Sequence, residues 1–325
     1  MIAAATLIAT ATANAKELIR VGSFTAEKAI GVQQVIIPWM KAVEAEVGDK
    51  VELKGFWGGS LGRDPFKQYD LVKSGVVDIA WIVGGYAPGR FPQLHVLELP
   101  FMAGNAVEAG VAGWEMFSKG LVEGVDDFKV ITIWAASGDN LHLRKPIKEL
   151  EDVKNLRLRT ASSAQASTMQ SLGAIPQTMG PVQVNDALSH GALDGLVQGY
   201  TGMKTFGTFN VVTSTYEIPL GNSPFLLLMN KEKWEALPPE VKAAMDKHGG
   251  RALSVKAGEA YDAETQEIRK AQMSDANYTI VTPSQADLDK YRKQLGEIHK
   301  DWIAKNKNGE QTYKLFESSL AETRK

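Results

Sequence analysis

The sequence lacks cysteine, and it carries almost no net charge. Without cysteine there can be no thiolate nucleophile, disulfide framework or thiolate metal site. The 36 Lys and Arg residues are balanced by 38 Asp and Glu, and no block of like charge is long enough to neutralise a phosphate backbone, so nucleic acid is not an expected partner. The five histidines form no His-x-x-x-His pair, and no phosphate-binding glycine motif occurs. We therefore expect neither a metal nor a cofactor.

Long hydrophobic runs are also absent. After the first residues, no segment reaches the ~20 apolar residues that a membrane helix needs. The opening MIAAATLIATATANA is uncharged and apolar, and it ends on Ala13-Asn14-Ala15, the small-x-small pattern of a signal peptidase site, although no basic residue follows Met1. We expect residues 1–15 to be a signal peptide, Lys16 to begin the mature chain and the protein to be exported.

Alternating strand and helix patterns are typical of an α/β fold. Residues 17–24 alternate like a strand, residues 29–48 have helical spacing up to Gly48, and residues 50–57 return to period two. Further strands are expected at 129–136, 155–160, 224–230 and 278–283. After residue 230 the sequence becomes charged and helix-periodic, with a break at Gly249-Gly250. The sequence contains no low-complexity linker, so we expect several crossing segments to join the two lobes.

One sequence pattern occurs twice, as DLVKSGVVDIA at 70–80 and as DALSHGALDGL at 186–196. In each copy an Asp is followed five residues later by Gly and eight residues later by a second Asp. The glycines, Gly75 and Gly191, are placed to end a helix in the left-handed conformation, and the apolar run that follows each one is typical of a buried strand. The repeat therefore predicts two similar α/β layers.

A secreted serine hydrolase is one alternative. GGSLG at 58–62 matches the Gly-x-Ser-x-Gly nucleophile elbow and follows a predicted strand, which would make Ser60 the nucleophile. Such a site also needs an acid and a histidine, and none of the five histidines lies in a recognisable partner motif. A loop leading into the helix near Phe66 explains the same residues.

Arg159 is the best candidate for ligand binding. It lies near the carboxyl end of the predicted strand NLRLRT, directly before Ser162 and Ser163, which are suitable helix N-caps. Ligands of open α/β sheets bind at this position, and a guanidinium suits a carboxylate. Arg157, two residues earlier, is interpreted as a solvated surface residue.

Long stretches of the chain resemble the solute-binding proteins of TRAP (tripartite ATP-independent periplasmic) transporters. The likeness covers SLGRDPFKQYDLVKSGVVDIAWIVGGYAPGRFPQLHVLELPF, KPIKELEDVKNLRLRT, ALDGL and LLLMNKEKWEALPPEV, in the family's order. It implies an α/β fold of the periplasmic binding protein type, with two lobes, a ligand cleft and a long helix spanning both lobes. We expect lobe I to comprise 16–140 and about 225–265, and lobe II to comprise 141–224 and about 266–325.

The resemblance also implies a role. Such a protein is not an enzyme: it captures an organic acid in the periplasm by lobe closure and delivers it to the TRAP membrane permease, and we expect a monomer. A sensor that presents its ligand to a receptor would share the same cleft. Arg159 matches the family's signature arginine, which implies a salt bridge to the substrate carboxylate. The other expected ligand-binding residues are Tyr200, Gln198, Asn222, Phe225, Phe24, Trp57, Tyr86, Asn140, His142 and Ser162.

The chemistry of the ligand is the last expectation. The sequence offers His142 with Asn140 in place of a second arginine, so a monocarboxylate is expected rather than a dicarboxylate. Aromatic residues at predicted strand ends favour an aromatic or hydroxy acid, although Trp81 among them is equally well explained as core.

Overall fold

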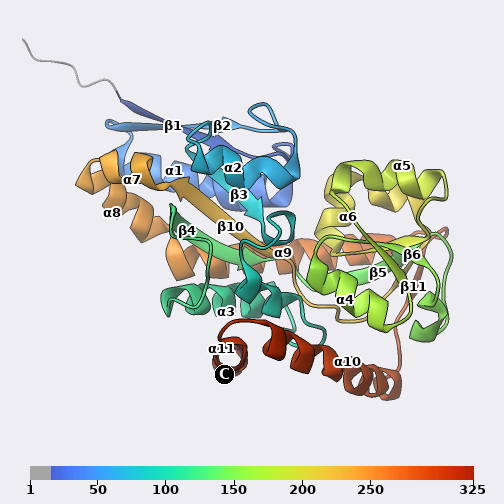
Figure 1. Cartoon of the computed structure of the whole chain (residues 1–325). Helices are drawn as coiled ribbons and strands as arrows, with labels where there is room; N and C mark the ends of the chain where they lie inside the picture. Colours follow the sequence, from blue (N-terminus) through green and yellow to red (C-terminus); the bar gives the residue numbers. More distant parts are fainter. Residues whose placement is uncertain (1–15) are drawn as a thin grey trace, which may run out of the picture.

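The computed structural model describes residues 16–325, and it consists of two lobes, each built around its own sheet (Figure 1). The predicted signal peptide, residues 1–15, lies outside the described residues. In the part of the chain described, no helix is both long enough and apolar enough to span a membrane.

Lobe I contains a five-stranded sheet in the order β2-β1-β3-β10-β4. β1 pairs in parallel with β2 and β3, whereas β10 runs antiparallel to β3 and β4. Both β3 and β10 are buried along their whole length, which explains their continuous apolar sequences. The strands are β1 (Glu17–Gly22), β2 (Val51–Phe56), β3 (Ile79–Val83), β4 (Phe128–Ala135) and β10 (Pro224–Asn230), and the helices are α1 (Ile37–Val47), α2 (Gln68–Lys73), α3 (Ala106–Ser118), α7 (Lys231–Ala236) and α8 (Pro239–His248).

Lobe II contains a six-stranded sheet in the order β11-β9-β5-β8-β6-β7. β6 pairs in parallel with β7 and β8, and β5 runs antiparallel to β8 and β9, so this sheet repeats the arrangement of lobe I. The strands are β5 (Asn140–Leu143), β6 (Arg157–Thr160), β7 (Ile175–Thr178), β8 (Gly195–Gln198), β9 (Ser214–Tyr216) and β11 (Thr279–Val281), and the helices are α4 (Ser163–Ser171), α5 (Val184–Ser189) and α6 (Tyr200–Phe206).

Short helical turns connect these elements. η1 is a single π-helical stretch that leads into α1, and the others are 3₁₀ turns. The turns are η1 (Gly31–Ile36), η2 (Pro65–Lys67), η3 (Gly84–Tyr86), η4 (Pro92–Glu98), η5 (Leu150–Val153), η6 (Pro181–Gln183) and η7 (Thr208–Val211).

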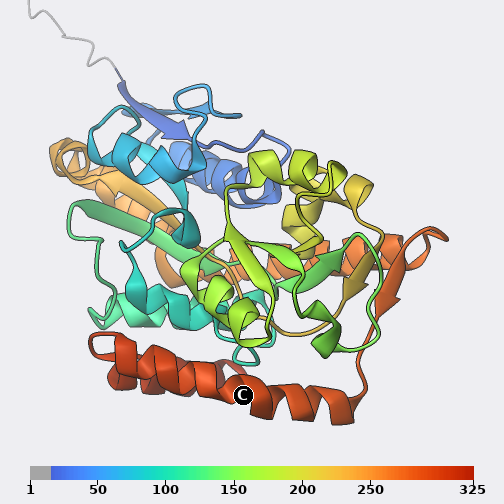
Figure 2. The same ribbon diagram turned by 45° about the vertical axis from the view of Figure 1, so that its right-hand side comes forward.

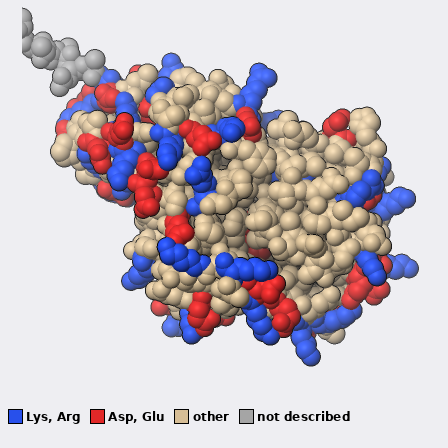
Figure 3. All heavy atoms as spheres, in the orientation of Figure 1, with Lys and Arg blue, Asp and Glu red and all other residues tan. Residues whose placement is uncertain are grey.

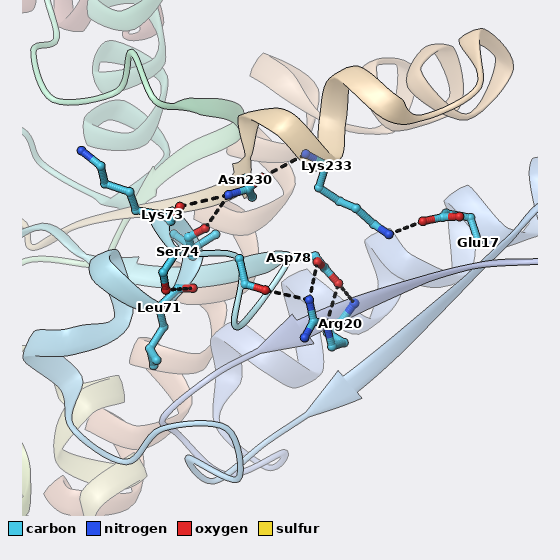
Figure 4. Close-up of polar contacts among 10 residues, drawn as sticks. Glu17, Arg20, Leu71, Lys73, Ser74, Asp78, Asn230 and Lys233 are labelled. Atoms are coloured by element: carbon cyan, nitrogen blue, oxygen red, sulfur yellow. Dashed lines mark hydrogen bonds and ion pairs between the residues drawn. The ribbon is translucent and has the colours of Figure 1, made fainter.

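The duplicated sequence pattern corresponds to a duplicated structural device. Gly75 and Gly191 each end a short helix, and both have φ +71°. In lobe I the carboxylate of Asp78 accepts hydrogen bonds from the Arg20 backbone N–H at 2.7 Å, from Nε at 2.9 Å and from Nη2 at 2.8 Å (Figure 4). In lobe II the carboxylate of Asp194 accepts the same three bonds from Arg157, at 2.8, 3.0 and 2.9 Å. Each pair ties the start of one strand to its parallel neighbour.

The lobes are joined by two hydrogen-bonded segments and one long helix. Residues 136–139 lead from β4 to β5, residues 217–223 lead from β9 to β10, and Asp139 N–H donates to Gly221 O at 2.7 Å between them. Helix α9 (Gly250–Met273) packs on α3 and β4 of lobe I and on α6 and β11 of lobe II (Figures 1 and 2). It begins directly after the break at Gly249.

The last two helices lead from lobe II back to lobe I. α10 (Gln285–Lys305) packs on α4 of lobe II, whereas α11 (Gly309–Thr323) packs on α3 and η4 of lobe I (Figure 2). The sequence placed the whole of 266–325 with lobe II. Residues of α11 belong by contact to lobe I because Phe316 and Leu320 are buried in the same apolar cluster as Phe91 and Leu97.

Candidate functional site

A cavity lies between the two lobes, at the carboxyl ends of strands from both sheets. Lobe I supplies mainly aromatic side chains, lobe II supplies mainly polar ones, and both crossing segments and α9 contribute. Among the residues that line it are Phe24, Trp81, Tyr86 and Phe225 from lobe I, Arg159, Gln165, Gln198, Thr201, Thr205 and Phe206 from lobe II, Asp139 and Ser223 from the crossing segments, and Tyr261 from α9.

The aromatic wall is centred on Trp81. Its ring meets Phe225 edge-on with centroids 5.3 Å apart, and it lies 6.3 Å from the ring of Phe24. Phe24 in turn stacks on Phe206 of lobe II at 6.5 Å. Aromatic pairs at these separations form stable apolar surfaces. The wall therefore suits the flat apolar part of a ligand.

Arg159 lies on the polar side of the cavity, and it is only 1% exposed. Its Nε donates to Met179 O at 3.0 Å, and its Nη2 donates to the Tyr86 hydroxyl at 2.9 Å, across the two lobes. Nη1 has one long contact, 3.5 Å to Val197 O. Among the described residues, no carboxylate lies within 4.0 Å of this guanidinium. A buried cation without an anionic partner is costly, so an acid entering the cavity would complete the site.

The lobes touch each other at the rim of the cavity. A Cβ added to Gly85 of lobe I would lie 2.9 Å from the backbone oxygen of Ala161 in lobe II. A Cβ on Gly180 of lobe II would lie 3.1 Å from side-chain atoms of Pro65 and Phe66 in lobe I. A side chain on Gly85 would force the backbones of the two lobes apart, and one on Gly180 would require the facing side chains to shift. The structure is thus one in which the lobes are closed over the cavity.

The expected ligand-binding residues fall into two groups. One group lines the cavity, and its members are Phe24, Tyr86, Arg159, Gln198 and Phe225. The other group does not line it, and its members are Trp57, Asn140, His142, Ser162, Tyr200 and Asn222.

His142 is not a second cation at the cavity. It is fully buried in β5, where one ring nitrogen contacts the Thr215 hydroxyl at 2.8 Å and the other contacts Gln198 O at 3.0 Å. Burial lowers the pKa of His142 to about 4, so the ring is neutral at ordinary pH. Alternation along β5 turned this side chain into lobe II.

Tyr200 and Asn140 face the opposite side of the crossing segments. The Tyr200 hydroxyl donates to Glu217 at 3.0 Å, and Asn140 Nδ2 donates to Gly138 O at 3.2 Å. Both residues border a separate hollow beside Arg269 of α9. The sequence predicted Tyr200 at the cavity, after the buried run that follows Gly191. In the structure β8 ends at Gln198 and Tyr200 begins α6, which redirects its ring.

The other three residues have structural contacts. Ser162 caps α4 by accepting from Gln165 N–H at 3.1 Å. Asn222 is fully buried and donates to Ala136 O at 3.0 Å. Trp57 packs on the lobe I core and covers Gly55.

Sequence reasoning missed several polar residues of the cavity, above all Asp139. It is 1% exposed, and its Oδ2 accepts from Ser223 Oγ at 2.8 Å and from Gln165 Nε2 at 2.9 Å. Residues 136–139 show no periodicity and match no motif. The one available signal was their position after a buried apolar strand, where open sheets bind ligands.

Ser60 is not placed as an enzymatic nucleophile. It lies exposed in a turn where Gly58 and Gly59 have φ +67° and +74°, followed by the Asp64-capped turn η2. No hydrogen bond found in residues 16–325 joins its hydroxyl to a histidine. Within the same residues, no group of three or more His, Asp or Glu is arranged to hold a metal ion.

Comparison with known proteins identifies the class to which this cleft belongs. Residues 21–306 match the bacterial extracellular solute-binding protein family 7. The chain therefore belongs to this family, which includes the TRAP solute-binding proteins, as the resemblance implied. The two-lobed α/β fold, the role in solute binding and the location outside the cytoplasm are confirmed, and the hydrolase alternative finds no support.

Three relatives illustrate the likeness. A TRAP solute-binding protein from an unidentified marine microbe, specific for aromatic acids and solved with 3-hydroxybenzoate, is 30% identical over 96% of this chain and 100% of its own, with a TM-score of 0.90. One from Rhodoferax ferrireducens, solved with copurified benzoate, is 26% identical over 94% of this chain and 98% of its own, with a TM-score of 0.88. The C4-dicarboxylate-binding periplasmic protein DctP of Rhodobacter capsulatus is 24% identical over 70% of this chain and 69% of its own length.

Proposed function

We propose that this TRAP solute-binding protein captures an aromatic monocarboxylate, such as a benzoate or a hydroxybenzoate, in the periplasm and delivers it to the membrane permease as a monomer. The observation that carries the proposal is Arg159, which is buried at the cavity with no carboxylate partner among the described residues. We propose that the ligand carboxylate binds its Nη atoms end-on, while the ring packs against Phe24, Trp81 and Phe225.

Three features support one carboxylate rather than two. Arg159 is the one Lys or Arg among the residues lining the cavity, and the carboxyl of Asp139 lies in the same wall. A second ligand carboxylate would therefore find no cation in this lining to balance its charge. The wall opposite Arg159 is apolar and aromatic, which favours a ring over a second charged group. The two relatives solved with aromatic acids agree with this choice.

Arg159→Lys is the test, and Arg157→Lys on the same strand is its matched control. A lysine cannot reproduce the planar fork, so we expect the affinity for 3-hydroxybenzoate to fall about 100-fold, or ~2.7 kcal/mol. Arg157 pairs with Asp194 outside the cavity, so its variant should bind within about twofold of the wild type.

Isothermal titration calorimetry measures both variants, with thermal unfolding as a check on folding. Equal losses in the two variants would contradict the assignment of Arg159. Binding of a C4-dicarboxylate in preference to benzoate would contradict the proposed ligand class.

We also propose that the protein has no hydrolase activity, because no hydrogen bond within residues 16–325 joins the Ser60 hydroxyl to a histidine or an acid. Ester turnover that disappears in Ser60→Ala would contradict this.

A further inference from the structure

Structural contacts alone do not explain why Asp139 is buried beside the cavity. It lies on the crossing segment between β4 and β5, its backbone is bonded to Leu220 and Gly221 on the other crossing segment, and its side chain lines the ligand cavity. A carboxylate is an expensive group to bury beside a site that binds anions. Its presence there calls for a role in binding.

The two oxygens of this carboxyl have different surroundings. Oδ2 accepts from Gln165 Nε2 at 2.9 Å and from Ser223 Oγ at 2.8 Å. The orientation of the Gln165 amide is fixed, because its Oε1 accepts from Ala161 N–H at 2.7 Å. Oδ1 has no hydrogen bond among the described residues and lies beside Gly199. Of the two oxygens, Oδ1 is therefore the one that can carry a proton and use it.

The charged groups around Asp139 oppose a second negative charge. Burial raises its pKa to about 7; the buried carboxylate Glu98 of η4 adds to the rise, while Arg159 of β6 and the bonds from Ser223 and Gln165 reduce it. Glu98 is itself paired with His95. The other titratable groups near this segment are Tyr86 and Tyr261, which line the cavity, and Asp262 of α9, which accepts from Ser137. Asp139 also borders the hollow beside α9, whose titratable groups include Tyr200, Glu217 and Arg269, with Glu217 and Arg269 paired to each other. A ligand carboxylate on Arg159 would neutralise the cation that lies with Asp139 in the lining of the cavity.

We propose that Asp139 is a ligand-binding residue that holds a proton on Oδ1 in the complex and uses this O–H to donate a hydrogen bond to the bound acid, so that the cleft takes up one carboxylate together with one proton. The proton comes from solvent, and no covalent bond changes. The inference rests on the proposed function, since it requires an acid in this cavity. It makes capture stronger in acidic surroundings and selects for acids with an acceptor within reach of Oδ1.

Calorimetry of the wild type with benzoate, in buffers of different ionisation enthalpy, counts the protons directly. Benzoate stays ionised throughout the range from pH 5.5 to pH 8.5. We expect uptake close to one proton at pH 8.5 and close to zero at pH 5.5, with Kd rising about tenfold per pH unit above pH 7. In Asp139→Asn, which keeps the shape of the side chain, uptake should be close to zero at both pH values, and Kd should vary less than about twofold between pH 5.5 and pH 8.5.

Ser223→Ala provides a second, independent variant. It keeps the titrating carboxyl and removes one donor that stabilises the ionised form, so the rise of Kd should move to higher pH. A residue with only a structural role would weaken binding equally at every pH. Comparison with Asp139→Asn also separates Asp139 from His95 as the group that takes up the proton.

The outcomes separate the two proposals. Binding of benzoate by the wild type without proton uptake at pH 8.5 would overturn the role of Asp139 and leave the proposed function standing. Proton uptake that persists unchanged in Asp139→Asn would overturn it too. If the wild type bound no aromatic acid at any pH, the proposed function would fail, and this inference would fail with it.

Discussion

The two lobes are the same scaffold with one decisive difference. In lobe I, Arg20 pairs with Asp78, and in lobe II, Arg157 pairs with Asp194, through the same three hydrogen bonds. Two residues after each arginine, the register places Gly22 beside Ala80 and Arg159 beside Leu196. Gly22 and Arg159 therefore occupy equivalent positions.

Different packing lies behind this difference. A Cβ added to Gly22 would lie 2.8 Å from Val77 Cγ1, so the position is closed in lobe I. In lobe II the same position opens to the cavity and holds the guanidinium. The same arrangement of strands thus provides a ligand-binding residue in lobe II and not in lobe I, because Arg159 stands at the position of Gly22. Lobe I contributes aromatic side chains to the same cavity.

The largest difference in stability is expected between variants that remove the aspartate of each ion pair. Asp78 is 5% exposed at its side chain and Asp194 is 29% exposed. Asp78→Ala removes a carboxylate that is almost fully buried and takes away the acceptor of the Arg20 backbone N–H and Nε. It should therefore lower the free energy of unfolding by about 3 kcal/mol, against about 1 kcal/mol for Asp194→Ala. Urea unfolding measures both. Equal losses would show that burial does not distinguish the pairs.

The next largest effect is a pH dependence of stability that arises in only one of two equivalent strands. β10 of lobe I is apolar at its centre, whereas β5 of lobe II holds the buried His142. Because the folded pKa of about 4 lies below the unfolded value of about 6.5, its contribution is complete above pH 6.5 and is lost as the pH falls toward 4. At pH 5 the loss should be about 2 kcal/mol.

His142→Gln should flatten this dependence of the melting temperature on pH. His190→Gln, at an exposed site, serves as the control and should leave the slope unchanged. An unchanged slope in His142→Gln would mean that another group titrates.

The smallest loss of stability is expected from substitution of Gly22, the lobe I counterpart of Arg159. Gly22→Ala should cost about 1 to 2 kcal/mol, because the new methyl meets Val77. Adding Val77→Ala should recover part of this loss, since it removes the clashing methyl groups. Differential scanning calorimetry of the single and double variants tests the coupling, and strictly additive losses would show that the two side chains do not meet.

Sequence alone predicted the parts of the fold that follow from periodicity. The β-α-β opening, the glycine stops of the repeat and the break at Gly249 all reflect local patterns. β7 was missed because an exposed edge strand containing Pro176 lacks strand alternation. The position of α11 was missed because helical periodicity does not say which lobe an apolar face will cover.

The site was predictable only where a residue follows from strand position or from family likeness. Arg159 met both conditions, and Phe24, Tyr86, Gln198 and Phe225 also line the cavity. His142 and Tyr200 lie near the cavity in sequence, but a strand face and a helix start turn them away. No local pattern marks Asp139, because its two side-chain partners, Gln165 and Ser223, come from two other segments of the chain.

A crystal structure of the protein grown with benzoate tests the central claim most directly. We expect the carboxylate of the bound benzoate to lie within hydrogen-bond distance of the Arg159 Nη atoms, and its ring to lie between Phe24, Trp81 and Phe225. A benzoate bound outside this cavity, or an Arg159 whose Nη atoms do not touch the acid, would contradict the central claim.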